Sequence, residues 1–183
     1  WSSDVCSSDL FLLTGVLALN VEGLRASLFY LAVYGIATLG GFAVVTLVRD
    51  SSGEVTDLNR WVGLARRSPL VATIFALFLL SFAGIPLTSG FIGKFTIFSA
   101  AYESGNIAVV VVGVLSSAIA AFFYIRVIVM MFLNDPEEDS VAITIPSIFT
   151  SATIWSAAIV TVVMGIFPTP ILNAISSLAT FLR

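Results

Sequence analysis

The chain has 183 residues, of which 58% are hydrophobic and only 10% are charged. A soluble domain carries about 25% charged residues, so this composition excludes an ordinary soluble domain, and a formal charge of −3 without a basic patch argues against nucleic-acid binding. The absence of histidine and the single cysteine argue against haem, zinc and iron–sulfur sites and rule out a disulfide within the chain.

Several apolar runs exceed the roughly 20 residues that a helix needs to span a bilayer. Backbone groups inside a bilayer must be hydrogen-bonded within the protein, so the spans are helices or a closed barrel. The runs are continuous rather than alternating, which favours helices. We therefore predict an all-α, polytopic transmembrane helix bundle in contact with the lipid bilayer, with about four spans, one of them discontinuous.

The first ten residues, WSSDVCSSDL, differ abruptly in composition from the apolar segment that begins at Phe11, and they repeat Ser-Ser-Asp. They lack the charged and then apolar layout of a signal peptide. We interpret residues 1–10, including Cys6, as a non-native artefact, with a short polar terminus as the alternative. Residues 11–183 are then expected to be the C-terminal part of a transmembrane domain whose natural chain begins further upstream.

Two apolar segments precede the first long polar connection. Residues 11–20 are too short to span and resemble the end of a helix, whereas residues 24–48 are predicted to form the first complete span. Within it, Tyr30, Tyr34 and Thr38 share one face because they are four residues apart. Their hydroxyls suit either hydrogen bonds between helices or a part in conduction, and the sequence leaves both open.

The connection from residue 49 to residue 67 contains the segment DLNRWVGLARR. Asp57 is a candidate N-cap, and the apolar residues after it fall on one helical face. We predict a short amphipathic helix at the membrane surface, with Trp61 at the depth of the lipid headgroups.

Residues 69–102 form an apolar stretch of 34 residues. As one straight helix it would be about 50 Å long, far more than a bilayer core of about 30 Å. It is therefore either two spans with a tight turn or one broken span, and Gly84, Pro86 and Gly90 place the break. We favour one broken span, because most arginines then fall on one side of the membrane, which would be cytoplasmic.

Two further spans are predicted, from 106 to 133 and from 146 to 167. In the first, Gly113 and Ser117 belong to a stripe of small residues that Tyr124 continues. The acidic segment 134–140 between the spans suits a solvated loop better than a metal site, because its carboxylates lack ligand spacing. The sequence Pro168-Thr-Pro170 ends the last span, and a short final helix is expected to lie at the interface or against the bundle.

Lys94 is the only charged residue between Arg67 and Glu103. A lone ammonium at membrane depth costs at least a few kcal/mol, and beside a broken helix it is typical of a site that moves ions or protons. Desolvation lowers the pKa of a lysine, so a buried lysine can release and regain a proton. Carbonyls freed at the break would add acceptors, and Thr88, Ser89, Ser117 and Tyr124 are candidates to line a water path. The alternative is a lysine that extends to the headgroups.

The segment RRSPLVATIFALFLLSFAGIPLTSGFIGKF closely resembles subunit N of respiratory NADH-quinone oxidoreductase (complex I). The preceding YGIATLGGFAVVTLVRD and the later SSAIAAFFYIRVIVMMF fit the same family in the same order. The resemblance covers residues 11–183, roughly the C-terminal third of such a subunit, and is specific for the antiporter-like superfamily. GFIGKF is its most telling part.

The resemblance implies that residues 69–102 are the broken helix of the second of two inverted repeats. Lys94 would match the lysine assigned to the exit half of a proton path. No cofactor is then expected in this chain, because NADH, FMN, iron–sulfur clusters and quinone would bind to partner subunits. The partners would be the other membrane subunits of complex I, in a bacterial plasma membrane. A subunit of a Mrp-type cation/proton antiporter and a non-conducting membrane scaffold are the alternatives.

Overall fold

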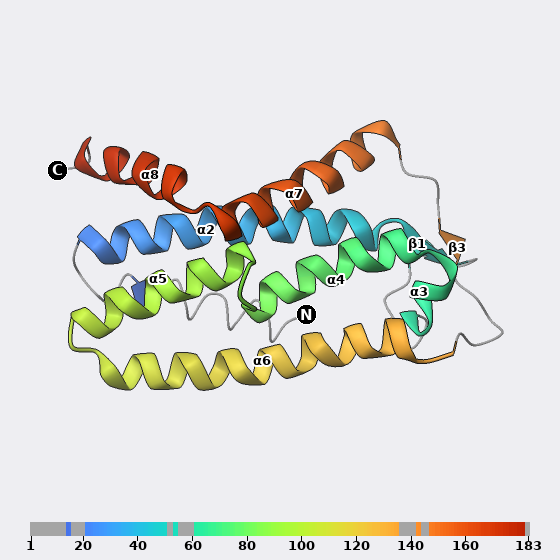
Figure 1. Ribbon diagram of the computed structural model, residues 1–183, viewed down its shortest axis with the longest axis horizontal. Coiled ribbons are helices and arrows are strands. Elements are labelled where there is room, and N and C mark those ends of the chain that lie inside the picture. The colour runs from blue at the N-terminus through green and yellow to red at the C-terminus, as the bar shows by residue number, and fades with distance from the viewer. Residues whose placement is uncertain are drawn as a thin grey trace.

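The structure is a computed structural model that describes residues 14–15, 21–50, 53–54, 61–135, 142–143 and 147–181. Figure 1 shows an elongated helix bundle with a few short strands at one end. Its labelled helices are α2 (Val21–Val45), α3 (Leu64–Arg67), α4 (Pro69–Ala83), α5 (Ser89–Glu103), α6 (Ile107–Leu133), α7 (Ile148–Ile166) and α8 (Thr169–Phe181). The strands are β1 (Val48–Asp50), β2 (Gly53–Glu54) and β3 (Ala142–Ile143).

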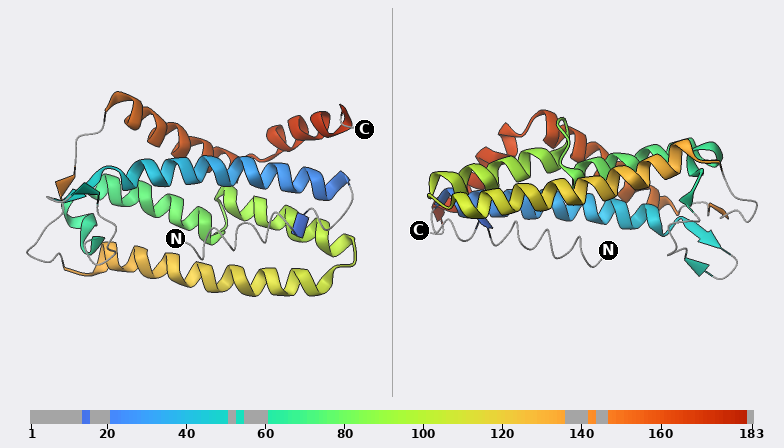
Figure 2. Two further views of the ribbon diagram at one scale, coloured as in Figure 1. Left: turned by 180° about the vertical axis from the view of Figure 1, so that it is seen from behind. Right: turned by 90° about the horizontal axis from the view of Figure 1, so that it is seen from below.

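The bundle is built around α4 and α5, which follow one another along the same direction (Figure 1). Helices α2 and α6 run along the whole length of this pair, with α4 and α5 between them. Helix α7 crosses α2 and reaches the middle of the bundle, and α8 continues along the other half of α2 (Figure 2). Segments from both halves of the chain therefore surround the junction between α4 and α5.

Within the described part of the chain, three helices, α2, α6 and α7, are long and apolar enough to cross a membrane. Helices α4 and α5 have 15 residues each, and a helix of that length, about 22 Å, is too short to cross a core of about 30 Å alone. Because they continue in one direction, they form a single discontinuous span (Figure 1). This confirms the predicted helical fold with about four spans, and it excludes two spans joined by a tight turn.

The main core lies where α2, α4, α6 and α7 meet, toward the end that carries α3. Phe78 is fully buried there, and it packs so closely on Gly40 that a Cβ atom at Gly40 would lie 2.3 Å from its ring. Helix α6, in contrast, has few buried residues, and its outward face carries large apolar side chains, including Val112, Leu115, Ile119 and Phe122. Such a face suits lipid or neighbouring membrane helices.

The structure corrects the prediction for the connection before α4. The predicted helix runs from Asp57 to Arg67, whereas the observed helix α3 begins only at Leu64. It follows Gly63 directly, whose φ of 69° is left-handed. Residues 57–60 lie outside the described part. Trp61 is 4% exposed, and its ring centroid lies 4.9 Å from that of Phe75 on α4. Trp61 is therefore a core residue packed on α4, and its side chain does not face outward as a lipid-contacting tryptophan of an amphipathic helix would.

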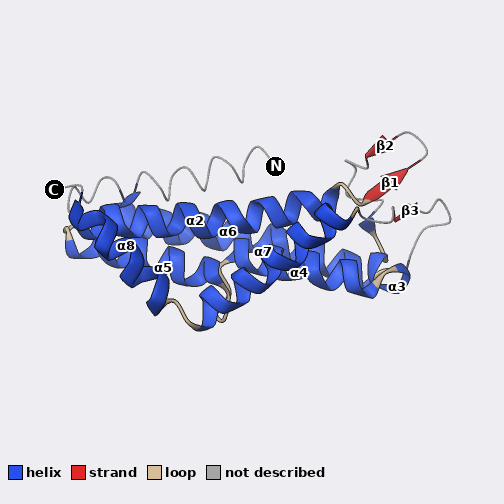
Figure 3. Ribbon diagram, turned by 90° about the horizontal axis from the view of Figure 1, so that it is seen from above, coloured by secondary structure: helices blue, strands red, loops and turns tan. Residues whose placement is uncertain are grey.

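A three-stranded antiparallel sheet, in the order β2-β1-β3, was not expected from the sequence. It pairs Arg49 with Glu54 and Val48 with Ile143, so it joins the loop after α2 to the loop after α6 at the α3 end (Figure 3). The predicted span of residues 24–48 is shifted accordingly, since α2 covers Val21–Val45 and Val48 begins β1.

The acidic segment after α6 and the final helix α8 come in the order predicted from the sequence. Asp135, at the start of the acidic segment, forms an ion pair with Arg66, whereas residues 136–140 lie outside the described part. Helix α8 packs against the bundle: the side chains of Ile171, Leu172 and Ile175 contact the cluster of Phe29, Val33 and Met164 on α2 and α7. Of the two positions expected for the final helix, the structure shows the one against the bundle.

Candidate functional site

The helix is interrupted between Ala83, the last residue of α4, and Ser89, the first residue of α5. Gly84 is the C-cap of α4, with a left-handed φ of 77°, and its N–H donates to the carbonyls of Leu80 and Ser81. Leu87 also has a positive φ of 76°, which is rare for a residue with a branched side chain. Thr88 closes the turn, because its hydroxyl donates to the carbonyl of Ile85 at 2.7 Å, and α5 begins at the next residue.

The two half-helices approach each other very closely at Gly90. A Cβ atom there would lie 1.8 Å from the carbonyl oxygen of Ser81, which no packing tolerates. The N–H of Gly90 donates to Ser81 Oγ at 3.2 Å, and Ser89 Oγ lies 3.4 Å from the same oxygen. Gly90 therefore lets the first turn of α5 rest on the last turn of α4, and Ser81 supplies a hydrogen-bond acceptor to that turn.

Lys94, on the second turn of α5, is 8% exposed and its side chain returns toward the end of α4. Its Nζ atom donates to Phe82 O at 2.8 Å, to Ser117 Oγ at 2.9 Å and to Ala83 O at 3.4 Å. The carboxyl end of a helix carries a partial negative charge. The ammonium is thus held inside the bundle by oxygen atoms of α4 and α6, and it does not extend to the surface of the described structure.

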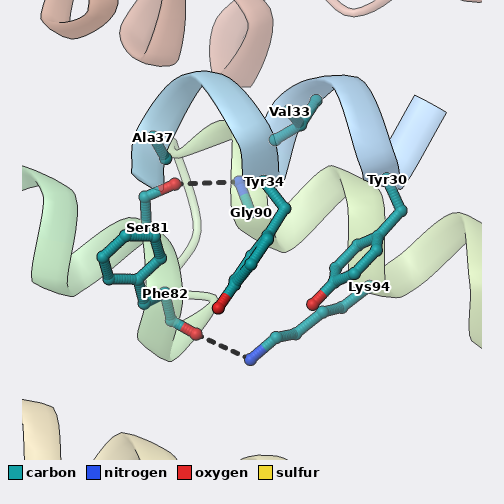
Figure 4. A pocket seen from close by; sticks show the side chains of 8 residues that line it. All are labelled: Tyr30, Val33, Tyr34, Ala37, Ser81, Phe82, Gly90 and Lys94. Atoms are coloured by element: carbon teal, nitrogen blue, oxygen red, sulfur yellow. Dashed lines mark hydrogen bonds between the residues drawn. The ribbon is translucent and has the colours of Figure 1, made fainter. Parts of the chain in front are cut away.

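A small cavity of about 10 Å³ lies beside Lys94, on the side of α2. Its wall consists of Tyr30, Val33, Tyr34, Ala37, Ser81, Phe82, Gly90 and Lys94, which Figure 4 shows converging from α2, α4 and α5. One buried water molecule needs a cavity volume of about 10–15 Å³. Most of this wall is apolar, and Tyr30, Tyr34, Ser81 and Lys94 are the residues in it that carry polar side-chain groups. The cavity is therefore at the lower limit of size for a single water molecule next to the lysine.

A row of aromatic rings crosses the site from α2 to α6. Tyr30 stacks on Tyr34 with ring centroids 5.6 Å apart, Tyr34 contacts Phe82 at 5.6 Å, and Phe82 contacts Tyr124 at 5.7 Å. The backbone oxygen of Phe82, in the middle of this row, is the nearest acceptor of Lys94. Such rings fix the position of the peptide group that holds the ammonium.

The structure brings some of the predicted site residues to Lys94 and leaves others apart. Ser117 bonds to the ammonium, and the ring of Tyr124 packs on that of Phe82, whose carbonyl accepts from the lysine. Thr88 and Ser89 are buried in the turn between the half-helices, and neither lines the cavity beside the lysine. Gly84 is the C-cap of α4, Gly90 lies in the first turn of α5, and Pro86 lies between them.

Sequence reasoning did not single out Ser81 as a site residue. The signal was present, because Ser81 is the last hydroxyl in the apolar run of α4, three residues before the glycine that ends the helix. Among the described residues, no group of histidine, cysteine, aspartate or glutamate is placed to hold a metal ion. The chemistry available at this site is therefore that of one amine, several hydroxyls and backbone carbonyls.

A bundle of apolar helices with one discontinuous span and a buried lysine at the break places the chain in the class of multi-pass membrane proteins. Residues 9–120 match the family model described as NADH:quinone oxidoreductase/Mrp antiporter, transmembrane. This match covers more than half of the chain, and the chain belongs to that family.

Curated relatives are much longer than this chain. It is 60% identical over 173 residues to NADH-quinone oxidoreductase subunit N of Rhodococcus opacus, covering 94% of this chain and 32% of the relative. Subunit N 3 of Streptomyces griseus is 57% identical over 173 residues, which is 94% of this chain and 31% of that protein. The chain thus spans about a third of the length of these relatives. Its apolar helices and its family make it a multi-pass protein of the bacterial plasma membrane.

Solved structures show the same fold. A chain of respiratory complex I from Thermus thermophilus aligns with a TM-score of 0.73 and 24% identity, covering 95% of this chain and 45% of the other. A chain of the Mrp complex from Dietzia aligns with a TM-score of 0.77 and 24% identity, covering 92% and 39%. The discontinuous span is therefore set in an architecture that occurs both in a respiratory complex and in an antiporter complex.

Proposed function

We propose that the chain is part of a membrane subunit of respiratory NADH-quinone oxidoreductase, in which Lys94 transfers protons across the membrane. The observation that carries this proposal is the setting of Lys94: a buried amine that donates to three oxygen atoms, two of them at the end of the first half-helix. Relatives with up to 60% identity carry the name of subunit N of this enzyme, which supports this choice within the family.

The chemical step is a proton exchange at Nζ. In the charged state, the ammonium is held by Phe82 O, Ala83 O and Ser117 Oγ. When the proton passes to a water molecule, the neutral amine keeps two N–H donors and gains a lone pair that accepts the next proton. Lysine can alternate between these states when its surroundings change, whereas arginine stays protonated.

The cavity gives the proton a route of entry or exit on the side of α2. Tyr30, Tyr34 and Ser81, which carry hydroxyls, are among the residues that line a space of the size of one water molecule beside the lysine. Thr88 and Ser89 lie in the turn outside this space, so we assign the water contact of Lys94 to the α2 side and to Ser117. This revises the set of candidate lining residues while keeping Lys94 at its centre.

The redox reaction would take place elsewhere. NADH, FMN, the iron–sulfur clusters and quinone would bind to partner subunits, and the other membrane subunits of complex I would be the direct neighbours of this chain. Electron transfer would then change the electrostatic surroundings of Lys94 through those neighbours. The proposal makes this chain a non-redox part of the enzyme, without a catalytic step of its own outside the complex.

The test uses the full-length protein in its native complex. Membrane vesicles from a strain lacking its gene, and from the same strain with the gene restored, are supplied with NADH, and internal acidification is recorded. We expect acidification to depend on the gene and to occur without sodium. Acidification that instead requires a sodium gradient and persists without NADH would overturn the proposal in favour of an antiporter.

A further inference from the structure

Helix α7 ends against the turn that joins the two half-helices (Figure 1). Gly165 lies in the last turn of α7 and is buried. A Cβ atom on Gly165 would lie 2.4 Å from the carbonyl oxygen of Leu87, and 2.6 Å and 2.7 Å from the carbonyl carbon and the Cα atom of Thr88. These three are backbone atoms, so a change of side-chain rotamer makes no room for a methyl group at residue 165.

The two residues that Gly165 contacts determine how α5 begins. Thr88 is the N-cap of α5 and is 5% exposed. Leu87 has a positive φ of 76°, and a residue with a side chain keeps such a conformation only where its surroundings determine it. The side chain of Leu87 is 74% exposed, so its own packing within the described part does not do so. The backbone is held instead by two hydrogen bonds from Thr88 to the carbonyl of Ile85 and by the contact with Gly165.

The start of α5 in turn determines where the lysine lies relative to α4. Lys94 is on the second turn of α5, whereas two of its three acceptors, Phe82 O and Ala83 O, belong to the last turn of α4. The bond to Phe82 O is 2.8 Å long. Hydrogen bonds of this kind weaken beyond about 3.2 Å, so a shift of α5 away from the end of α4 loosens the hold on the ammonium.

We infer that Gly165 is a positioning residue for Lys94. The bare backbone of α7 at Gly165 lets the turn of residues 87–88 pack against it, and this contact holds the start of α5 at the distance from α4 at which the ammonium meets the last carbonyls of α4. Helix α7 is thereby linked to the lysine site through the turn. Since α8 follows α7 directly and packs on α2, a displacement of this end of α7 reaches the lysine by the same contact.

The test introduces Gly165→Ala into the full-length protein in its native complex, and cryo-electron microscopy locates the turn and the lysine. A methyl group needs about 3.5 Å to the oxygen of Leu87 in place of 2.4 Å, so we expect the turn to move from α7 by about 1 Å. The distance from Lys94 Nζ to Phe82 O should then exceed hydrogen-bond range. The functional readout rests on the proposed function: proton pumping per NADH oxidised should fall about two- to tenfold, as for one lost hydrogen bond to the ammonium.

Gly40→Ala on α2 is the matched control, because Gly40 is packed as tightly against the same helices. A Cβ atom there would lie 2.3 Å from the ring of Phe78 on α4 and 2.8 Å from the Cβ atom of Ala157 on α7, and none of its three nearest atoms belongs to the turn. Overpacking lowers stability wherever it occurs, so both variants should yield less assembled complex. Pumping per NADH oxidised in the complex that does assemble should fall only in Gly165→Ala.

A double variant covers the case in which Gly165→Ala does not assemble. Leu87→Gly together with Gly165→Ala gives residue 87 access to the φ values that only glycine adopts readily. The turn can then move aside, and we expect assembly to recover while Lys94 Nζ stays displaced from Phe82 O. Failure of both variants to assemble would overturn the inference, because the contact would then serve assembly alone.

Two further results would overturn the inference. One is a Gly165→Ala complex in which α7 moves away and the distance from Lys94 Nζ to Phe82 O keeps its wild-type value. The other is an equal fall of the pumping ratio in Gly40→Ala. The distances are measured without reference to pumping, so a displaced lysine in a complex whose wild-type form pumps no protons would count against the proposed function and support the positioning role of Gly165.

Discussion

The side chain of Lys94 lies directly over Gly84. A Cβ atom on Gly84 would be 3.0 Å from Cδ and 3.4 Å from Nζ of the lysine, and the glycine also adopts a left-handed φ of 77°. The residue that ends the first half-helix thus makes the space into which the side chain from the second half-helix folds. The break and the lysine are one structural unit, because a larger residue at Gly84 would require the side chain of Lys94 to shift by a few tenths of an ångström.

We therefore expect Gly84→Ala to displace the side chain of Lys94 in addition to straining the backbone at residue 84. An alanine in the left-handed region costs about 1–2 kcal/mol, and here its methyl group would also press on Lys94. Gly105→Ala is the matched control, because Gly105 has a φ of 80° and a methyl group there would meet nothing within 4 Å. Proton pumping per NADH oxidised should fall in Gly84→Ala alone. An equal fall in both variants would mean that backbone strain, and not the contact with Lys94, is responsible.

Gly90→Ala should prevent the half-helices from packing. Its methyl group would lie 1.8 Å from Ser81 O, so α5 must move away from α4. Overpacking of this kind costs about 1–3 kcal/mol or more, and we expect less assembled complex and a lower thermal transition. Gly35→Ala on α2, where nothing lies within 4 Å, should leave both unchanged. Native gel electrophoresis of the two variants checks this, and normal assembly of Gly90→Ala would show that the close approach is not needed.

Ser117→Ala removes one of the three acceptors of the ammonium, whose bond to Ser117 Oγ is 2.9 Å long. A hydrogen bond to a charged group contributes about 1.5–3 kcal/mol. Since a water molecule can replace part of that contribution, we expect pumping to slow by about two- to tenfold. The neighbouring variant Ser116→Ala is the control, because its hydroxyl is not among the three oxygen atoms that hold Lys94 in the described part. Identical rates for the two variants would contradict a specific role of Ser117.

Trp61→Ala distinguishes a core residue from an interfacial one. Trp61 packs on Phe75 and is 4% exposed, so truncation should cost about 3–5 kcal/mol through the cavity that it leaves. The measurement is the thermal transition of the purified complex in detergent. A tryptophan that merely lies among the lipid headgroups would give almost no change, and such a result would contradict the assignment of Trp61 to the core.

The discontinuous span could be predicted because its signals are local. A stretch too long for one straight span, with Gly84 and Pro86 in its middle, leaves few alternatives, and Lys94 is conspicuous as a lone charge in an apolar run. The identity of its acceptors depends on tertiary structure. Ser117 is 23 residues away in sequence, and only the packing of α6 beside α5 brings its hydroxyl to the lysine.

Two features, the burial of Trp61 and the pairing of β1 with β3, could not be predicted from the sequence for physical reasons. The periodicity around Trp61 indicates an apolar face, but the same face fits a lipid surface or a groove between helices, and the left-handed Gly63 interrupts the predicted helix. The pairing of Val48 with Ile143 joins strands of two and three residues that lie far apart in the chain. Such short, distant strands carry no periodic signal.

The most direct test of the account is NADH-driven proton pumping by the full-length complex with Lys94→Met, with NADH oxidation and assembly measured in parallel. Methionine keeps much of the side-chain volume and removes the titrating amine. A positioned proton-transfer group contributes about 10²–10⁴-fold to rate, so we predict that pumping falls at least about tenfold in a complex that still assembles. Pumping and oxidation at wild-type rates would contradict the assignment of Lys94 to the proton path.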